Sequence, residues 1–590
     1  MPRHDPHSYA DASQPVADFL VWRAQVDFAE RTLSCEAILR FAEAVSAGPL
    51  DLDTRDLFIL SVTDDHDQRL AYDLAPAEPI LGARLRIHLT GGAREVRITY
   101  RTSPDATALQ WLAAAQTSGG RQPFLYTQCQ PIHARSIIPL QDTPRTRLRF
   151  EAELEVPAEL TPLLAAESLG QEQRGERTVA RFRMPQPISP YLFAFAVGDL
   201  IARDLSPRSR VWAEPEMIDA AAYEFADTER LLATGEQLFG PYDWERYDIL
   251  VLPPAFPYGG MENPRLTFLT PSIIAGDRSL VSVVAHELAH SWTGNLVSNA
   301  NAEHFWLNEG GATYAERRIV EAEWGPDIAA LDWALGRREL TDAMQRLASA
   351  ERWPITRLRT ELQGIDPDEA YTVVPYEKGA LLLRAIEEAV GRPAFDAFLR
   401  IYLNTFRFGV LTTEEFVTFL DRQLPADALS RVSISAWLYE PGLPASAPSP
   451  RSARLEAITS LSGQPPTDEQ AQSWTAVEWQ LYLESIPEPA PFELLAELDR
   501  RFGLMQSRNS DVLEKWLVLA MRSAYAPALP RVEDVLEHVG RMKYLRALYA
   551  ALADYDLAHA ERLFQRNGAN YHPIARQVVR NELKLAADRT

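Results

Sequence analysis

The chain has 590 residues, 46% of them hydrophobic, and a formal net charge of -23 at pH 7. At roughly 150 residues per domain, this length predicts three or four packed units. The acidic balance excludes a nucleic-acid surface, which needs clustered lysine and arginine. No run approaches the roughly 20 apolar residues that cross a bilayer. We therefore expect a multidomain protein that binds neither nucleic acid nor membrane.

Cysteine usage indicates the compartment. Only Cys35 and Cys129 occur, too few for a disulfide framework or a thiolate zinc site. Residues 1–16 are polar and proline-containing, without the apolar core of a secretory signal. Both features predict a cytoplasmic protein.

Residues 1–202 alternate between polar and apolar side chains. Residues 85–89 (Leu-Arg-Ile-His-Leu) and 96–100 (Val-Arg-Ile-Thr-Tyr) flank a turn at 90–93, and residues 148–156 alternate in the same way. Such a period of two is typical of half-buried strands with one wet face. We predict a β-rich N-terminal domain.

A helical period marks the next part of the chain, residues 203–443. Between Ser279 and Trp292 the apolar residues recur at helical spacing, with Asp277 or Ser279 as the expected N-cap. This part is expected to be a mostly helical catalytic domain.

Proline density sets off the last part. Residues 441–450 contain four prolines, which favours an extended linker at 444–456 rather than a packed element. Residues 457–590 are rich in leucine, alanine, glutamate and arginine at helical spacing. They predict an all-helical C-terminal domain.

A metal-binding motif, His286-Glu287-Leu288-Ala289-His290, lies in the predicted helix after Ser279. Residues four apart on a helix share a face, so both imidazoles reach one ion while Glu287 sits beside them. A catalytic zinc needs a third protein ligand and an open position for water, and Glu309 supplies that ligand from a following helix. We predict one Zn²⁺ per chain, bound by His286, His290 and Glu309.

Two simpler interpretations compete with this one. The motif could occur by chance on an amphipathic helix, or the zinc could be structural, although such sites usually use cysteines and close the fourth position. The spacing to Glu309 favours a catalytic site. Water at such a zinc has a pKa of about 7, and Glu287 is expected to take its proton as the water attacks a carbonyl.

Other motifs surround the zinc helix. They are Phe-Pro-Tyr-Gly-Gly-Met-Glu-Asn-Pro at 256–264, His-Ser-Trp-Thr-Gly-Asn-Leu at 290–296 and His-Phe-Trp-Leu-Asn-Glu at 304–309. With the zinc motif they resemble the gluzincin (M1) zinc aminopeptidases, in the leukotriene A4 hydrolase branch. Segments 128–130, 375–379 and 540–543 extend the resemblance over most of the chain. It implies a multidomain α+β fold: a β-rich N-terminal domain, a thermolysin-like catalytic domain and a helical C-terminal domain.

The glycine-rich motif predicts recognition of a peptide's amino end. Gly259 and Gly260 let the backbone approach a peptide closely, and Glu262 offers a carboxylate to the α-ammonium group. A packing carboxylate is the alternative for Glu262. The resemblance assigns the same anchoring role to Gln130. It also places the neighbouring Tyr258 and Met261 among the substrate-binding residues.

The resemblance implies three further functional residues. Tyr376 matches the tyrosine that donates a hydrogen bond to the oxyanion, although alone it would be interpreted as a core residue. Arg541 and Lys543 match a basic pair that binds the carboxylate of short peptides, tripeptides in particular; an exposed basic turn is the alternative. Lys378 is interpreted as a solvated charge.

Two other functions compete with peptide hydrolysis. The branch also includes epoxide hydrolysis of a small lipid, which uses an aspartate matching Asp368 near Tyr371; binding of polar parts of peptides and a turn cap are the alternatives for Asp368. Ala302 stands where that lipid pocket has a tryptophan, and Thr360 where an apolar residue would help, so an apolar channel is less expected here. An inactive zinc-bearing scaffold that binds protein partners is the third hypothesis. It is disfavoured because base, ligands, amine anchor and oxyanion donor are all present.

Overall fold

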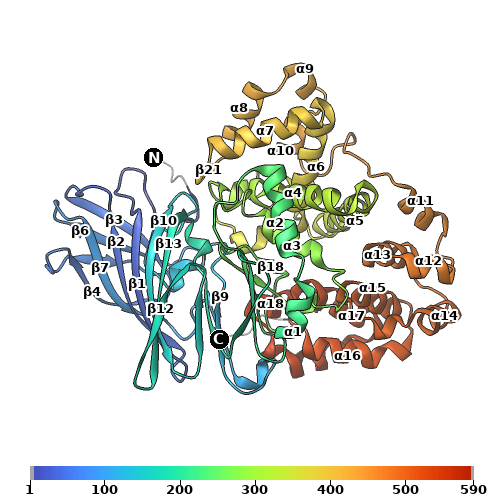
Figure 1. Ribbon diagram of the computed structural model, residues 1–590, viewed down its shortest axis with the longest axis horizontal. Helices are drawn as coiled ribbons and strands as arrows, with labels where there is room; N and C mark the ends of the chain where they lie inside the picture. Colours follow the sequence, from blue (N-terminus) through green and yellow to red (C-terminus); the bar gives the residue numbers. More distant parts are fainter. Residues whose placement is uncertain (1–4, 586–590) are drawn as a thin grey trace.

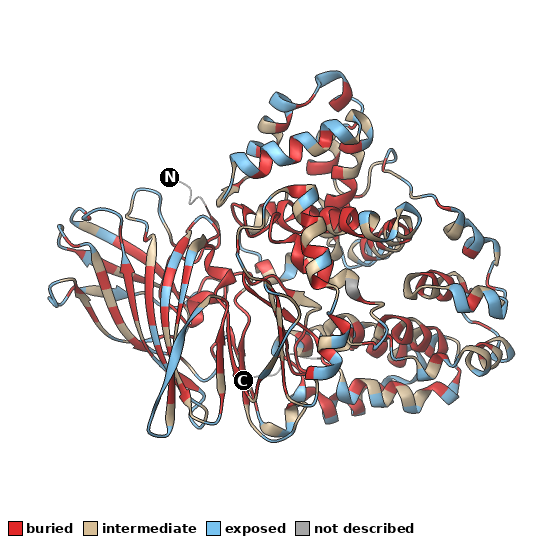
Figure 2. Cartoon of the chain, viewed as in Figure 1, coloured by how far each residue is buried: buried red, intermediate tan, exposed pale blue. Residues whose placement is uncertain are grey.

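A seven-stranded sheet forms the body of the N-terminal part of the computed structural model, which describes residues 5–585 (Figure 1). In spatial order its strands are β12 (Glu167–Arg174), β13 (Arg177–Ile188), β10 (Leu148–Pro157), β1 (Phe19–Asp27), β2 (Thr32–Arg40), β7 (Glu95–Arg101) and β4 (Phe58–Asp64). Leu148, Phe150, Ala152 and Leu154 of β10 are buried, while the residues that alternate with them are exposed or half-buried. The predicted period of two is confirmed, and Figure 2 shows the same alternation of buried and exposed positions along these strands.

Two smaller sheets complete this β-rich part. One contains β3 (Gly48–Thr54), β6 (Ala83–Leu89) and β5 (Tyr72–Leu74), and the other contains β11 (Thr161–Leu164), β14 (Phe195–Gly198), β9 (Phe124–Thr127) and β8 (Leu109–Leu112). The strands predicted at 85–89 and 96–100 exist as β6 and β7. They pair with different neighbours, β6 with β3 and β5, and β7 with β2 and β4. The turn at Gly91 and Gly92 therefore joins two sheets.

The middle part combines a small mixed sheet with a group of helices. The sheet contains β15 (Ile201–Asp204), β16 (Arg210–Ala213), β17 (Asp248–Val251), β19 (Leu266–Leu269) and β18 (Gly260–Met261). The helices are α1 (Ile218–Glu224), α2 (Thr228–Phe239), α3 (Val281–Ala289), α4 (Trp306–Trp324), α5 (Pro326–Ser349), α6 (Val373–Val390), α7 (Arg392–Thr405), α8 (Thr413–Gln423), α9 (Ala426–Leu429) and α10 (Ile434–Tyr439). A strand pair, β20 (Val297–Asn299) and β21 (Gly409–Leu411), lies beside them. This arrangement places the edge strand β18 against α3.

The N-cap predicted for the zinc helix is wrong. Helix α3 begins at Val281, and its N-cap is Leu280, without a capping side chain. Asp277 instead accepts the backbone N–H of Ser279 at 2.9 Å, which closes the turn before the helix. Ser279 accepts a hydrogen bond from Asn509 of the C-terminal part at 2.7 Å. The polar residues before α3 therefore hold the loop rather than the helix end.

The last part of the chain is helical, as predicted. Its helices are α11 (Ala453–Ser460), α12 (Asp468–Ser473), α13 (Ala476–Ser485), α14 (Phe492–Phe502), α15 (Ser510–Arg522), α16 (Leu529–His538), α17 (Met542–Asn567) and α18 (Pro573–Glu582). The proline-rich segment before them has no regular structure, yet Ala447 is buried and its carbonyl accepts from Arg337 of α5 at 3.2 Å. The segment predicted as extended linker is thus partly packed, and α11 begins within it. None of the helices in residues 5–585 is long and apolar enough to cross a membrane.

Helices α4 and α6 cross at two glycines. A Cβ on Gly310 would lie 2.7 Å from the Cα of Gly379, and a Cβ on Gly379 would lie 2.8 Å from the Cα of Gly310. Both distances are too short for any side chain, so the two backbones touch at this point. Gly310 directly follows Glu309, and Gly379 lies three residues after Tyr376. The crossing therefore fixes two of the predicted site residues relative to each other.

We expect Gly379→Ala to separate α4 from α6, because the added methyl group meets backbone atoms that cannot move independently. Overpacking of this kind costs about 1–3 kcal/mol of unfolding free energy, and peptidase activity should fall with it. Chemical denaturation and steady-state kinetics measure the two effects. Glu388→Ala, an exposed position on the same helix, is the control. A Gly379→Ala protein as stable and active as this control would contradict the interpretation.

Candidate active site

Three metal-ligand side chains meet where α3 and α4 approach each other. His286 lies on α3, His290 directly follows that helix, and Glu309 lies in the first turn of α4. The Nε2 atoms of His286 and His290 are each 3.4 Å from Oε2 of Glu309. The structure thus brings the three predicted ligands together.

The donor set fits a zinc ion. Oε2 of Glu309 is buried and has no hydrogen-bond partner among residues 5–585, which is costly unless a cation lies beside it. Burial acts to raise the pKa of Glu309, but His290 and His286 outweigh it and lower that pKa to about 2. Two imidazole nitrogens and an ionised carboxylate are the ligands of many catalytic zinc sites.

A hydrogen-bond acceptor at Nδ1 fixes the orientation of each imidazole ring. Nδ1 of His286 is 3.1 Å from Oε2 of Glu316, and Nδ1 of His290 is 3.1 Å from the carbonyl oxygen of Thr293. These acceptors place the hydrogen on Nδ1 and leave each Nε2 lone pair for the ion. Neither Glu316 nor Thr293 was predicted to have a role. Glu316 could have been found from its spacing, because it lies seven residues after Glu309, two turns along the same helix face.

The predicted base, Glu287, is packed against the glycine-rich strand. A Cβ on Gly260 would lie 2.3 Å from Oε1 of Glu287, so a larger residue here would displace the carboxylate of Glu287. Burial raises the pKa of Glu287 to about 7. A carboxylate with this pKa exchanges protons readily near neutral pH, which is what a general base and acid requires.

The predicted amine anchor lies beside the base. Glu262 is 3% exposed, and its Oε1 accepts a hydrogen bond from Nε2 of Gln130 at 3.2 Å. Ligand atoms of Glu262, Glu287 and His290 lie within 4.8 Å of one another. Burial raises the pKa of Glu262. This buried carboxylate suits a cationic partner such as an α-ammonium group.

The two other members of the glycine motif line the same strand. Met261 is buried, and its sulfur accepts from Nε2 of Gln128 at 3.3 Å. The ring of Tyr258 meets Phe256 edge to face at 6.0 Å. Both residues pack against the N-terminal core and fix the strand in place.

Tyr376 lies over the metal ligands. Its ring stacks on His286 with a centroid distance of 6.0 Å and an interplanar angle of 20°. Burial raises the pKa of Tyr376 well above its usual value, and Glu309 adds to the effect. The phenol therefore stays protonated and available as a hydrogen-bond donor.

Asp368 and Tyr371 lie on a neighbouring loop. Oδ2 of Asp368 is 3.0 Å from Nε2 of His133, and the ring of Tyr371 meets Phe305 edge to face at 4.1 Å. The turn-capping role considered for Asp368 belongs to Asp366, whose side chain accepts the backbone N–H of Asp368 at 3.0 Å. The carboxylate of Asp368 is thus held by a histidine and not by the turn.

Lys378 is not the solvated charge that was predicted. Its side chain is buried, and Nζ donates to the carbonyl oxygens of Thr356 at 2.9 Å and Glu440 at 3.0 Å. Burial lowers its pKa to about 7. Lys378 therefore ties α6 to two loops far away in the sequence.

The basic pair at the start of α17 is not an exposed turn. A Cβ on Gly259 would lie 2.7 Å from Nη2 of Arg541, so this guanidinium reaches the glycine-rich strand. Backbone hydrogen bonds from Gly540 to Pro254 at 2.9 Å and from Met542 to Pro257 at 2.8 Å fix the contact. The C-terminal part is therefore docked directly beside the site.

Arg541 and Lys543 have different surroundings. Nη1 of Arg541 donates to the hydroxyl of Tyr544 at 2.8 Å, while Nζ of Lys543 lies 3.3 Å from carboxylates of both Glu339 and Asp511. Burial acts to raise the pKa of Asp511, but Lys543 and Arg541 lower it to about 2. Lys543 is thus neutralised by acidic neighbours, and Arg541 is the cation that faces the strand.

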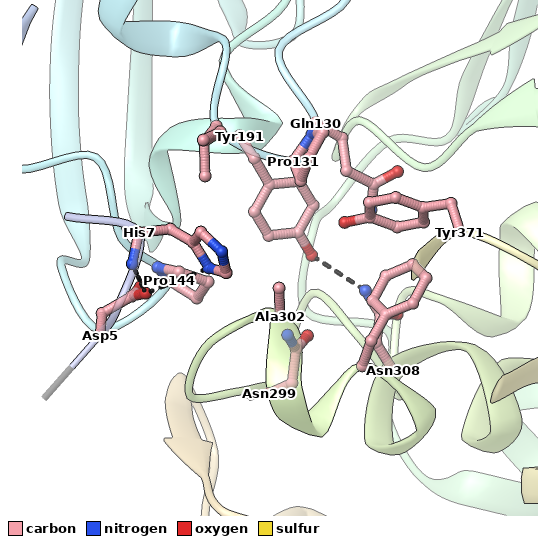
Figure 3. A pocket seen from close by; sticks show the side chains of 12 residues that line it. Asp5, His7, Gln130, Pro131, Pro144, Tyr191, Asn299, Ala302, Asn308 and Tyr371 are labelled. Atoms are coloured by element: carbon pink, nitrogen blue, oxygen red, sulfur yellow. Dashed lines mark hydrogen bonds and ion pairs between the residues drawn. The ribbon is translucent and has the colours of Figure 1, made fainter. Parts of the chain in front are cut away.

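A small cavity has Asn308, the residue before Glu309, in its wall (Figure 3). Gln130 and Tyr371 lie at one end of it, and His7 of the N-terminal segment lies at the other, with Ala302 between them. Thr360, the other residue that argued against an apolar channel, donates to the carbonyl oxygen of Glu303 at 3.3 Å. Ala302 contributes only a methyl group to the wall of this cavity.

Comparisons with known proteins agree with this geometry. Residues 6–192 match the peptidase M1 N-terminal domain, residues 223–437 the peptidase family M1 domain, and residues 474–583 the leukotriene A4 hydrolase C-terminal domain. Leukotriene A-4 hydrolase of Xenopus laevis is 36% identical, and the match covers 99% of this chain and 100% of that protein. Leucine aminopeptidase 2 of Neosartorya fischeri is 36% identical over 99% of this chain and 98% of its own.

Solved structures show the same architecture. Yeast leukotriene A4 hydrolase in complex with bestatin has a TM-score of 0.91 at 30% identity, covering 99% of this chain and 98% of its own. An M1 zinc metallopeptidase of Deinococcus radiodurans shares the fold over 76% of this chain and 99% of its own, with a TM-score of 0.60 at 23% identity.

The fold and the His-Glu-His-Glu constellation define a zinc hydrolase with a single catalytic metal. The chain belongs to peptidase family M1, in the branch that carries a leukotriene A4 hydrolase C-terminal domain, and it is a zinc aminopeptidase.

Glu316→Gln should weaken zinc binding, because a neutral amide holds the imidazole of His286 less firmly than a carboxylate does. Loss of such an outer partner typically lowers metal affinity roughly 10- to 100-fold. Competition with a fluorescent chelator measures the affinity directly. Glu321→Gln on the same helix, where the carboxylate pairs with Arg392 instead, is the control. Equal affinities in the two variants would contradict the assigned role.

Proposed function

We propose that this aminopeptidase acts on short peptides, tripeptides above all, and that its site residues divide the work as follows. The α-ammonium group binds Glu262 and Gln130, and the C-terminal carboxylate binds Arg541. The first peptide bond then lies beside Glu287 and Tyr376. The observation that carries the proposal is the pair of neighbouring glycines where β18 begins: Glu287 packs against Gly260, and Arg541 packs against Gly259.

The length preference follows from this strand. Gly260 and Gly259 are adjacent, and the contacts that a Cβ would make at each, 2.3 Å to Glu287 and 2.7 Å to Arg541, limit the separation of Oε1 and Nη2 to about 12 Å. Contact distances of about 3 Å to the base and to the guanidinium leave about 6 Å for the peptide. An extended residue spans roughly 3.3–3.6 Å, so about two residues, the second and third of a tripeptide, fit between the attacked bond and the carboxylate anchor. Longer peptides cannot place their carboxylate on Arg541 while their first bond is at Glu287.

Proton transfer belongs to Glu287. It takes the proton of the attacking water and returns it to the leaving amine, and its position against Gly260 aims the carboxylate into the site. Zinc held by His286, His290 and Glu309 would supply Lewis acidity, which polarises the carbonyl and acidifies water. The protonated phenol of Tyr376 donates a hydrogen bond to the oxyanion, a contribution of about 3 kcal/mol for such a donor.

Neighbouring side chains fix the position of Arg541, the proposed carboxylate anchor. Tyr544 accepts from Arg541 and donates to Asp511 at 2.9 Å, and Asp511 also pairs with Lys543. This chain of contacts keeps the guanidinium directed at Gly259 rather than at solvent. We therefore propose Arg541 as the direct ligand of the carboxylate and Lys543 as its positioning residue.

Epoxide hydrolysis stays a prediction and is not proposed as a second function. Asp368 and Tyr371 are close to the site, but the small cavity that Tyr371 lines also contains the polar side chains of Asp5 and His7. The inert scaffold gains no support, because the metal ligands, the base and the amine anchor lie together.

The two buried, unpaired cysteines support the proposed cytoplasmic location.

Glu287→Gln should retain zinc but lose hydrolysis of a free tripeptide by roughly 10²- to 10⁴-fold, because an amide cannot accept the proton. Metal analysis and initial rates are the two readouts. The wild-type enzyme should also fail to cleave the N-acetylated tripeptide, whose blocked amine cannot pair with Glu262. Substantial activity of the variant would overturn the assigned base. Equal rates on both peptides would overturn the amine anchor.

Arg541→Ala should lower kcat/KM for a free tripeptide about 10- to 100-fold, as expected for loss of a charge-assisted hydrogen bond. Amidation of the peptide's C-terminus should cause a similar loss in the wild-type enzyme and none in the variant, because both changes remove the same contact. Arg546→Ala, at an exposed position on the same helix, is the control. Independent, additive losses would show that Arg541 does not bind the carboxylate.

A further inference from the structure

The amine anchor lies directly after the end of a strand. β18 ends at Met261, so its pairing with β19 does not extend to Glu262. The backbone carbonyl oxygen of Glu262 instead accepts a hydrogen bond from Nδ2 of Asn295 at 2.7 Å, and both residues are buried. Because a carbonyl oxygen only accepts, the amide of Asn295 must turn its nitrogen toward Glu262. A side chain from another segment thus holds the backbone of the amine anchor.

The backbone of Asn295 is bonded to a predicted metal ligand. Its N–H donates to the carbonyl oxygen of His290 at 2.9 Å, which closes a turn directly after that ligand. Gly294 has a φ of +121°, a conformation that other residues rarely adopt, and a Cβ there would also lie 2.8 Å from Nδ1 of His290. The turn therefore fixes Asn295 close to the imidazole.

The N-terminal part of the chain holds Asn295 from another direction. Nη1 of Arg147 donates to the carbonyl oxygen of Asn295 at 2.9 Å, and Nη2 of Arg147 donates to that of Gly409 at 2.8 Å. The N–H of Asn295 is thus bonded to His290 and its carbonyl to Arg147. A backbone bonded on both sides has little freedom to move, so the amide that it carries has a fixed position.

The distance between the amine anchor and the metal ligands matters for this reaction. In a peptide only two carbon atoms join the α-nitrogen to the first carbonyl oxygen, so both groups must meet their partners at the same time. Ligand atoms of Glu262 and His290 lie within 4.8 Å of each other. Asn295 connects these two residues, through its amide to Glu262 and through its N–H to His290.

We propose that Asn295 is a positioning residue that sets the distance between the amine anchor and the metal ligands. The inference rests on the proposed function, in which Glu262 binds the α-ammonium group. Gln130 bonds the carboxylate of Glu262, whereas Asn295 bonds its backbone and is not a ligand of the substrate. Without the amide of Asn295, the backbone of Glu262 loses its bond to the segment that follows His290, and the ammonium group and the first carbonyl no longer reach their partners together.

Two ligands measure this distance. Leucine hydroxamate carries a metal-binding hydroxamate and an α-ammonium group, and 4-methylpentanohydroxamate is the same molecule without the amine. Both have the same side chain, so the ratio of their dissociation constants reports the amine contact alone. Calorimetry on the zinc-loaded wild-type enzyme should give a ratio of about 10 to 100 in favour of leucine hydroxamate, the effect of a charge-assisted hydrogen bond.

Asn295→Leu keeps the shape of the side chain but removes the donor. The ratio should fall about tenfold through weaker binding of leucine hydroxamate, while the affinities for the amine-free ligand and for zinc stay unchanged. The kcat/KM for a free tripeptide should fall with it, because misplacement of about 1 Å costs up to roughly 100-fold. An unchanged ratio would overturn the proposal. Equal weakening of both ligands would also overturn it, because a merely structural residue has that effect.

A second variant and a control complete the test. Asn295→Ala removes the same donor and leaves space instead of a bulky side chain, so it gives the answer if Asn295→Leu does not fold. Asn299→Leu is the matched control, because Nδ2 of the buried Asn299 donates to a carbonyl oxygen of the same segment, that of Asn301, at 2.8 Å. This control should keep the wild-type ratio. A similar fall in the control would contradict the role of Asn295.

The wild-type measurement separates the possible failures. If the wild-type enzyme binds both hydroxamates equally well, Glu262 does not bind the ammonium group, and the proposed function fails together with the inference. If the wild-type enzyme prefers leucine hydroxamate and the Asn295 variants keep that preference, only the inference about Asn295 fails.

Discussion

The active site depends on one carboxylate oxygen, Oε2 of Glu309, which has no hydrogen-bond partner in the part of the chain that the structure describes. It lies 3.4 Å from a nitrogen of each histidine, buried where an uncompensated charge is costly. The histidines are oriented by Glu316 and Thr293, and α4 is held by its glycine contact with α6. These three contacts hold the metal ligands in fixed positions, which a site with an open ligand position needs.

The same helix contact links metal binding to the rest of the chemistry. Because Gly310 touches Gly379, the helix that carries Glu309 and the helix that carries Tyr376 have one relative position. Lys378, next to that glycine, then ties α6 to the loops at Thr356 and Glu440. The positions of the predicted metal ligand Glu309 and of the proposed oxyanion donor Tyr376 thus follow from one packing arrangement.

How much of this could be predicted from the sequence depended on how local each feature is. The spacing of His286 and His290 is a property of one helix, and the period of two in β10 is a property of one strand, so both were accessible from the sequence alone. The fate of Lys378 was not, because its partners lie 22 and 62 residues away and the charge pattern does not reveal them. The separation of β6 and β7 into different sheets was missed for the same reason: local alternation identifies strands but not their neighbours. The resemblance predicted a carboxylate-binding role for Arg541, but its contact with Gly259 was not predicted, because the two residues lie far apart in the sequence.

Docking of α17 on the segment 254–259 has an evolutionary consequence. The hydrogen bonds of Gly540 and Met542 with Pro254 and Pro257 bring a cation from the C-terminal part to the edge of a catalytic centre built by other segments. On the proposed function, the limit on substrate length is a property of this junction and not of the zinc site. Insertions or losses at the junction can therefore convert a tripeptidase into an enzyme for longer chains, or the reverse, while the hydrolytic apparatus is inherited intact.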